Sequence, residues 1–106
     1  MGYIPVELDK TRNILLGFGA LKLFKELHGE SLMKIDFEKE DPEDILPLIV
    51  YVGLKHEDSE LTQEKTIELI DKHLGIKGAL ELLPRIFKEL NMDEESKNEM
   101  KAAGKK

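Results

Sequence analysis

The architecture of this chain depends most on one stretch, Asp41-Pro42-Glu43-Asp44-Ile45-Leu46-Pro47-Leu48-Ile49-Val50-Tyr51-Val52-Gly53-Leu54. Asp41 is a favoured residue just before a helix, Pro42 is favoured in the first turn, and two acids follow at the positive helix end. From Ile45 to Leu54 the apolar side chains would project in nearly every direction, so such a helix must be covered on most sides. It is therefore either the central helix of a small domain or a helix flanked by a second subunit. Three β-branched residues leave a buried strand as the weaker alternative: Ile49, Val50 and Val52.

The residues before this stretch predict a hairpin and a helix. Apolar and polar residues alternate from Ile4 to Asp9, as in a half-buried strand. A second strand over Thr11–Leu16 would follow the tight turn Asp9-Lys10, although that pair lacks the glycine common in such turns. A helix is expected from about Phe18 to His28, with one apolar face and a stop at Gly29.

The residues after the stretch predict two further helices and a tail. Thr62 is expected to cap a helix that ends at Gly75 and carries one apolar stripe, formed by Ile67, Ile70 and Leu74. The last helix is expected from about Gly78 to Leu90, with Pro84 causing a kink or a late start. Residues 91–106 hold only two large apolar side chains and are expected to form a polar, flexible tail.

Together these elements predict a mainly α fold. Residues 1–90 are expected to form a single helical domain of three to four helices, and the pattern also allows a short N-terminal β-hairpin. The alternation of Met33, Ile35 and Phe37 with charged residues also allows a brief extended segment. An apolar content of 41% over 106 residues is enough for one modest core.

The charge of the chain restricts the classes of partner. The formal net charge is -6, and residues 36–68 carry 11 acids against 3 bases, a balance of -8. Such a segment repels nucleic acid and anionic membrane surfaces, so an electrostatic partner is expected to be basic. The longest apolar run, Ile45 to Leu54, is about half of the roughly 20 residues that a membrane helix needs. The absence of cysteine suits a reducing cytosol, and the N-terminus lacks the pattern of a signal peptide.

The connector Gly53–Thr62 is the first candidate for a metal-binding or catalytic site, because it holds a histidine and several acids. Its spacing fits no calcium loop, and the helix is expected to end at Asp58-Ser59, which favours a capped, solvated connector. His28 and His73 fall in last helical turns, where a partly protonated imidazole interacts favourably with the negative end of the helix. No serine lies in a nucleophile-elbow sequence. We therefore expect no catalytic, metal-binding or cofactor-binding residue, no cofactor and no enzymatic activity, with interaction as the default function.

Three segments in order carry a resemblance to a known family. They are Tyr3-Ile4-Pro5-Val6-Glu7-Leu8-Asp9-Lys10-Thr11-Arg12, Gly53-Leu54-Lys55-His56-Glu57-Asp58-Ser59-Glu60-Leu61-Thr62 and Glu68-Leu69-Ile70-Asp71. In this order they resemble the tail assembly chaperones of long-tailed bacteriophages, of phage or prophage origin, over about residues 3–90. The chain departs from the family in lacking a glycine after Asp9, which weakens the expected hairpin turn.

The resemblance implies a non-enzymatic protein of the infected bacterial cytoplasm that is absent from the mature virion. Such a protein would bind the long helical tape measure protein, keep it soluble and help to recruit tail tube subunits. A programmed frameshift often extends these chaperones, and Gly104-Lys105-Lys106 is compatible with a slippery codon run. The alternative is a small acidic helical domain for protein interaction or regulation, without catalytic activity.

The expected partner-binding residues lie on one side of the apolar helix and in the connector after it. The chaperone role needs apolar grooves that accept amphipathic helices and release them. The candidates are Leu46, Val50, Tyr51 and Leu54, with an acidic rim at His56, Glu57 and Asp58. The opposing interpretation is that the four apolar residues fill the core, and self-association through the same surface to a homo-oligomer is a further alternative.

Overall fold

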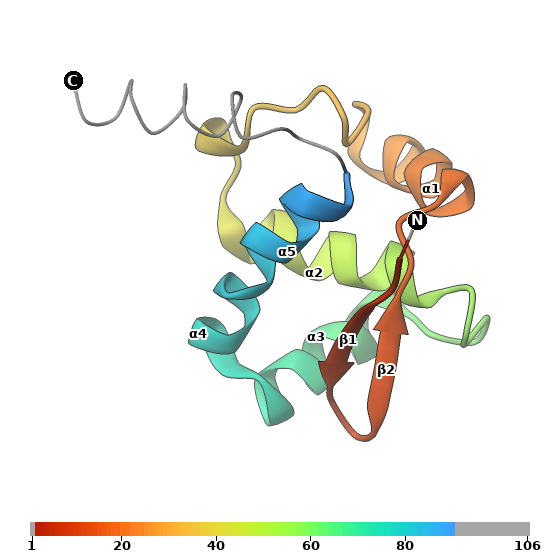
Figure 1. Ribbon diagram of the computed structural model, residues 1–106, viewed down its shortest axis with the longest axis vertical. Coiled ribbons are helices and arrows are strands. Elements are labelled where there is room, and N and C mark those ends of the chain that lie inside the picture. The colour runs from red at the N-terminus through yellow and green to blue at the C-terminus, as the bar shows by residue number, and fades with distance from the viewer. Residues whose placement is uncertain (1, 91–106) are drawn as a thin grey trace.

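A computed structural model describes residues 2–90 of the chain, and the expected tail at 91–106 lies outside the described residues. The fold is mainly helical with a two-stranded hairpin at its N-terminal end, as the sequence predicts (Figure 1). The elements in chain order are β1 (Ile4–Glu7), β2 (Thr11–Ile14), α1 (Phe18–His28), the 3-10 turn η1 (Phe37–Lys39), α2 (Pro42–Leu54), α3 (Gln63–His73), α4 (Gly75–Leu80) and α5 (Leu82–Glu89).

Helix α2 is the centre of the domain. It contacts α1, α3, α4 and β2, which surround it in Figure 1. Seven of its residues are buried, among them Ile49 and Val50 with no exposed surface. The prediction of a central, covered helix is confirmed, and the alternative of a buried strand is wrong. Asp41 occupies the position before the helix and Pro42 its first turn, but the Asp41 side chain makes no capping hydrogen bond.

The hairpin is antiparallel, with Ile4 opposite Ile14 and Glu7 opposite Thr11. Alternation along β1 buries Ile4 and Val6 and exposes the residues between them, so one face of the hairpin joins the core. The hairpin side of the domain meets α2 at Gly53, whose carbonyl oxygen accepts a hydrogen bond of 2.9 Å from the Leu15 N–H. Because a Cβ at Gly53 would overlap the side chain of Ile14, this contact requires glycine.

Two sequence predictions differ from the structure. Residues 33–38 form no strand: a turn follows Ser31, and η1 begins after Asp36. The physical reason is local, because the Ser31 hydroxyl accepts from the Met33 N–H and the Asp36 carboxylate accepts from the Glu38 N–H. Such side-chain bonds favour turns over a strand.

The expected last helix is divided into α4 and α5. Gly75 has a φ of 73° and turns the chain after α3, and α4 begins there rather than near Gly78. A break at Glu81 then lets α5 start at Leu82, so Pro84 falls in its first turn. The N–H that proline lacks has no intrahelical partner at this position, and the late start expected from Pro84 is thus confirmed.

Candidate functional site

Three predicted site residues of the connector, His56, Glu57 and Asp58, bond to the N-terminal hairpin. His56 Nε2 lies 2.7 Å from the Asn13 carbonyl oxygen, and its ring stacks on Tyr3 with 5.7 Å between centroids. The Glu57 carboxylate accepts hydrogen bonds of 3.1 Å from both the backbone N–H and the side-chain amide of Asn13. Burial raises the pKa of Glu57, but these bonds outweigh it, and the net pKa is lowered. The connector therefore holds the hairpin against the end of α2.

A buried arginine lies under this connector. Arg12 is 5% exposed, and its guanidinium donates to Asp9 through Nε at 2.8 Å and Nη2 at 2.9 Å. Nη1 donates to Asp58 Oδ2 at 3.3 Å. The hydrogen bond from Arg12 lowers the pKa of Asp9 to about 2, and the bonds to Asp9 and Asp58 raise the pKa of Arg12. Sequence reasoning placed Asp58 on an acidic rim and did not find its partner Arg12, 46 residues away.

The connector also stops one helix and starts the next, as predicted. The Thr62 hydroxyl accepts from the Lys65 N–H at 3.0 Å and so caps α3. Lys55 Nζ donates to the carbonyl oxygens of Ser59 and Leu61 and so links the end of α2 to the far part of the loop. Within residues 2–90, no group of three or more histidines and acids is arranged to hold a metal ion.

The other two histidines lie where the sequence places them, in last helical turns. His28 Nε2 is 3.0 Å from a Glu40 carboxylate oxygen, and its ring stacks on Phe24 at 4.9 Å between centroids. His73 is exposed at the end of α3. Among the described residues, neither histidine forms a hydrogen bond with a serine hydroxyl.

The four apolar candidates on α2 have different surroundings. Val50 and Leu54 have no exposed surface. Other elements of the domain therefore cover this side of α2, which the sequence indicates as a surface for a partner. Val50 and Leu54 are thus core residues with no surface for a partner, in line with the opposing interpretation. Tyr51 is half-buried, with Lys55 Nζ 5.5 Å from its ring centroid. Leu46 is largely buried, yet it lines an open groove.

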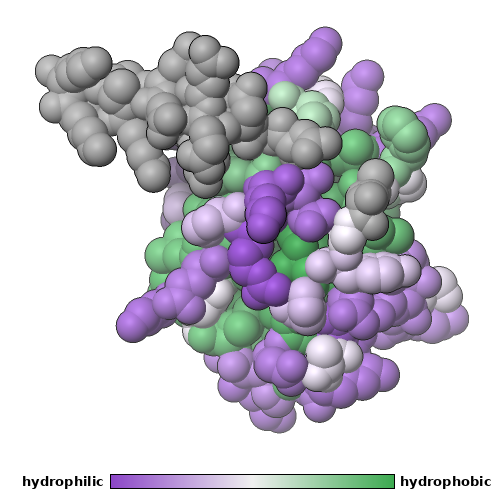
Figure 2. All heavy atoms as spheres, viewed as in Figure 1, coloured by the Kyte–Doolittle hydropathy of each residue, from purple (hydrophilic) through white to green (hydrophobic). Residues whose placement is uncertain are grey.

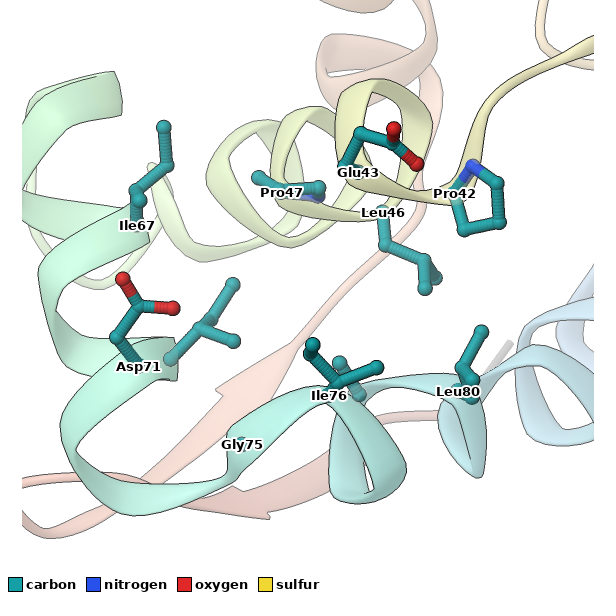
Figure 3. Close-up of a pocket in the computed structure, with 11 residues that line it drawn as sticks. Pro42, Glu43, Leu46, Pro47, Ile67, Asp71, Gly75, Ile76 and Leu80 are labelled. Atoms are coloured by element: carbon teal, nitrogen blue, oxygen red, sulfur yellow. The ribbon is translucent and has the colours of Figure 1, made fainter.

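This groove lies between α2, α3 and α4 and has a volume of about 540 Å³. Its walls come from three helices: Pro42, Glu43, Leu46 and Pro47 of α2, Ile67, Ile70 and Asp71 of α3, and Gly75, Ile76, Ala79 and Leu80 of α4. Nine of these 11 residues have no polar side-chain atom. In Figure 3, Leu46 points from α2 towards the space into which Ile76 and Leu80 point from α4. Its volume exceeds that of two other concavities among residues 2–90, which have volumes of about 430 Å³ and about 220 Å³.

Several groove residues leave apolar surface in water. Ile76 is 80% exposed, Ile67 is 44% exposed and Leu80 is 40% exposed, whereas Leu46, Ile70 and Ala79 form a buried floor. Apolar residues reach the surface on the side of the molecule where α4 lies (Figure 2). Contiguous exposed apolar residues in a concave, polar-rimmed setting are typical of interaction sites.

The charged side chains that line the groove are acidic. Glu43 and Asp71 are its only charged lining residues, and both are exposed acids. Pro47 has no N–H, so the Glu43 carbonyl oxygen loses the hydrogen bond that it would receive inside a regular helix. The groove thus combines an apolar floor with two acidic side chains in its lining.

Sequence reasoning found part of this groove. Leu46 is a predicted contact, and Ile67 and Ile70 belong to the predicted apolar stripe. Ile76 lies between the two predicted helices, the first of which ends at Gly75 and the second of which begins near Gly78. The missed signal is the spacing of Ile76 and Leu80, which are four residues apart and share a face once a helix starts at Gly75. The sequence pattern predicts Gly75 only as the end of a helix and not as the start of the next one.

No helix among the described residues is both long and apolar enough to cross a membrane. Comparison of the chain with models of known protein families, with curated proteins and with solved structures gave no match.

Proposed function

We propose that the chain is a tail assembly chaperone of a long-tailed bacteriophage or prophage. It binds the tape measure protein, keeps that protein soluble and helps to recruit tail tube subunits. It acts without catalysis in the cytoplasm of the bacterial host and is not part of the mature virion. The proposal rests on the resemblance of three sequence segments and on one structural observation, the groove between α2, α3 and α4.

The groove supplies the surface that this role requires. A long helical protein that awaits assembly exposes apolar stripes, and a chaperone must cover them and later release them. Ile67, Ile76 and Leu80 together offer exposed apolar surface around a preformed concavity of about 540 Å³. Because the groove is open and lined by few side chains, we expect affinity that is moderate enough for release.

The three segments that carry the resemblance occupy related places in the fold. The hairpin segment 3–12 and the connector 53–62 are joined through Arg12 and Asp58 and frame one end of α2. The third segment, 68–71, lies in α3 and contributes Ile70 and Asp71 to the groove. Two of the three segments thus hold one end of α2 in place, and the third forms part of one wall of the groove, which supports the family proposal.

The direct test is co-expression with the tape measure protein encoded downstream of this chain's gene. We expect the chain to raise the soluble yield of that protein and to co-purify with it. The groove variant for this test is Ile76→Glu, which places a charge in the groove at a position that is 80% exposed and so leaves the core intact. It should lose most of the gain in soluble yield.

Two outcomes oppose the proposal. If the wild-type chain neither raises the yield nor co-purifies, the chaperone role is wrong. If no long tape-measure reading frame lies in the gene neighbourhood, the phage assignment itself fails, and a helical interaction domain of another system takes its place.

A further inference from the structure

We propose that the groove between α2, α3 and α4 selects a partner helix whose apolar stripe is bordered by lysine or arginine. This inference rests on the proposed function for the identity of the site, but it concerns the chemistry of the occupant. It is carried by the placement of acids in the groove lining, which holds no basic residue.

The edge of the groove carries negative charge from two of its walls. Glu43 stands on α2 beside Pro42 and Pro47, and Asp71 stands on α3 near Ile67, so the two carboxylates come from different helices (Figure 3). Glu64 precedes Ile67 and Asp71 by three and seven residues and extends the same face of α3. No residue that lines the groove is basic.

The nearby bases do not cancel this charge. Lys65 donates to Glu68 at 3.0 Å, and Lys72 acts on the same carboxylate, whose pKa these two bases lower. These three residues therefore pair with one another on a separate face of α3. Lys77 lies beside Ile76 on α4 but does not line the groove.

The two carboxylates favour a basic partner, because Glu43 and Asp71 are the charged residues that line the groove. Lysine and arginine are the side chains that donate several hydrogen bonds while carrying positive charge. A helix with an apolar stripe would bury Ile67, Ile76 and Leu80, and its flanking bases would reach these carboxylates.

The occupant is thus an amphipathic basic helix, rather than an acidic or neutral one. Opposite charges at a partly exposed rim contribute selectivity and association rate more than affinity, and salt screens them. We therefore expect the preference for a basic partner to be strong at low ionic strength and to weaken as salt is added.

The test uses two synthetic helical peptides with the same leucine stripe, flanked in one by lysine and in the other by glutamate. Binding to the full chain is measured by fluorescence anisotropy at about 50 mM and about 500 mM salt. We expect the lysine peptide to bind about ten-fold more tightly at low salt and the difference to shrink at high salt. The double variant Glu43→Gln/Asp71→Asn should remove most of the difference.

The matched control is Glu26→Gln/Glu30→Gln, which changes the net charge equally at exposed positions on and just after α1. It should keep the preference for the lysine peptide. Ile76→Glu should weaken the binding of both peptides. Equal binding of the two peptides, with Ile76→Glu still weakening both, overturns the charge preference and leaves the chaperone proposal standing.

Two other results also overturn the inference. One is that neither peptide binds, in which case the groove does not take helices of this kind, whatever the co-expression shows. The other is that the wild-type chain sediments as a dimer that Ile76→Glu disperses, because a second copy would then occupy the groove.

Discussion

The guanidinium Nη1 of Arg12 lies 3.3 Å from Oδ2 of Asp58 and so joins β2 to the connector that follows α2. The same guanidinium binds Asp9 through two further hydrogen bonds. Arg12 is therefore the buried charge that fixes the hairpin turn and the connector together. The histidine and acids of the connector, which first invite a search for metal or catalytic chemistry, serve this junction through Asn13 and Arg12.

Replacing Arg12 with methionine should destabilise the fold. The Arg12→Met variant keeps the apolar stem but removes three hydrogen bonds, and Asp9 and Asp58 regain only part of their interaction through water. We expect the free energy of unfolding to fall by about 1–3 kcal/mol, measured by urea denaturation. In the exposed pair formed by Lys65 and Glu68, Lys65→Ala should cost less than about 0.5 kcal/mol. Equal effects of the two substitutions would argue against the junction.

The acid stability of the fold should depend on the same arginine. Hydrogen bonding to Arg12 lowers the pKa of Asp9 from 3.8 to about 2. A carboxyl whose pKa is lower in the folded state stabilises the fold above its unfolded pKa, and this stability is lost as the pH falls towards 2. We expect the urea midpoint of the wild type to fall between about pH 4 and pH 2, and less steeply in Arg12→Met. An Asp9 carboxyl that titrates near 3.8 by NMR in the folded wild type would contradict this assignment.

Adding a methyl group at Gly53 should disturb the contact between α2 and β2. A Cβ there would overlap the Ile14 side chain, next to the hydrogen bond from Leu15 to Gly53. We expect Gly53→Ala to lower the free energy of unfolding by about 1–3 kcal/mol, because a packed core accepts extra volume poorly. Gly19→Ala is the control: a Cβ at Gly19 meets nothing within 4 Å, and alanine favours helix by up to about 1 kcal/mol. Thermal denaturation should therefore separate the two variants in opposite directions.

Removing the hydroxyl of Thr62 should weaken the start of α3. The hydroxyl accepts the Lys65 N–H at 3.0 Å, and alanine cannot replace it. We expect Thr62→Ala to cost about 1 kcal/mol in urea denaturation, while Thr62→Ser keeps most of the stability. A serine variant as unstable as the alanine variant would show that the Thr62 methyl group, and not the cap, matters.

The sequence predicts those parts of the fold that local chemistry determines. Pro42 and the acids after it mark the start of α2, Gly29 ends α1 with a φ of 102°, and Thr62 caps α3. Strand alternation also predicts the hairpin, but its turn holds three residues, Leu8 to Lys10, and not the expected pair Asp9-Lys10. Each of these signals lies within a few residues of the feature that it specifies.

The candidate site was less predictable because it depends on packing between distant segments. Ile76 and Leu80 share a face only because α4 begins at Gly75, and they meet Leu46 only because α4 packs on α2. Likewise, the sequence alone does not tell whether an apolar helix residue such as Val50 is buried in the core or exposed to a partner. The neighbours that cover it come from elements far along the chain.

The central claim is that a partner helix binds in the groove between α2, α3 and α4. Burial of one isoleucine side chain contributes about 1.5–3 kcal/mol, so placing a carboxylate at Ile76 should reduce affinity at least about ten-fold. Ile76 is 80% exposed and Phe18, on α1 and away from the groove, is 83% exposed, so Phe18→Glu is a control of equal exposure and charge.

The most direct measurement is the dissociation constant of the purified chain with the tape measure protein for the wild type, Ile76→Glu and Phe18→Glu. We predict that Ile76→Glu loses at least about ten-fold in affinity, whereas Phe18→Glu stays within about two-fold of the wild type. Unfolding curves of the three proteins should coincide within about 0.5 kcal/mol, since both positions are exposed. Unchanged binding by Ile76→Glu, or an equal loss in Phe18→Glu, would contradict the claim that the partner occupies this groove.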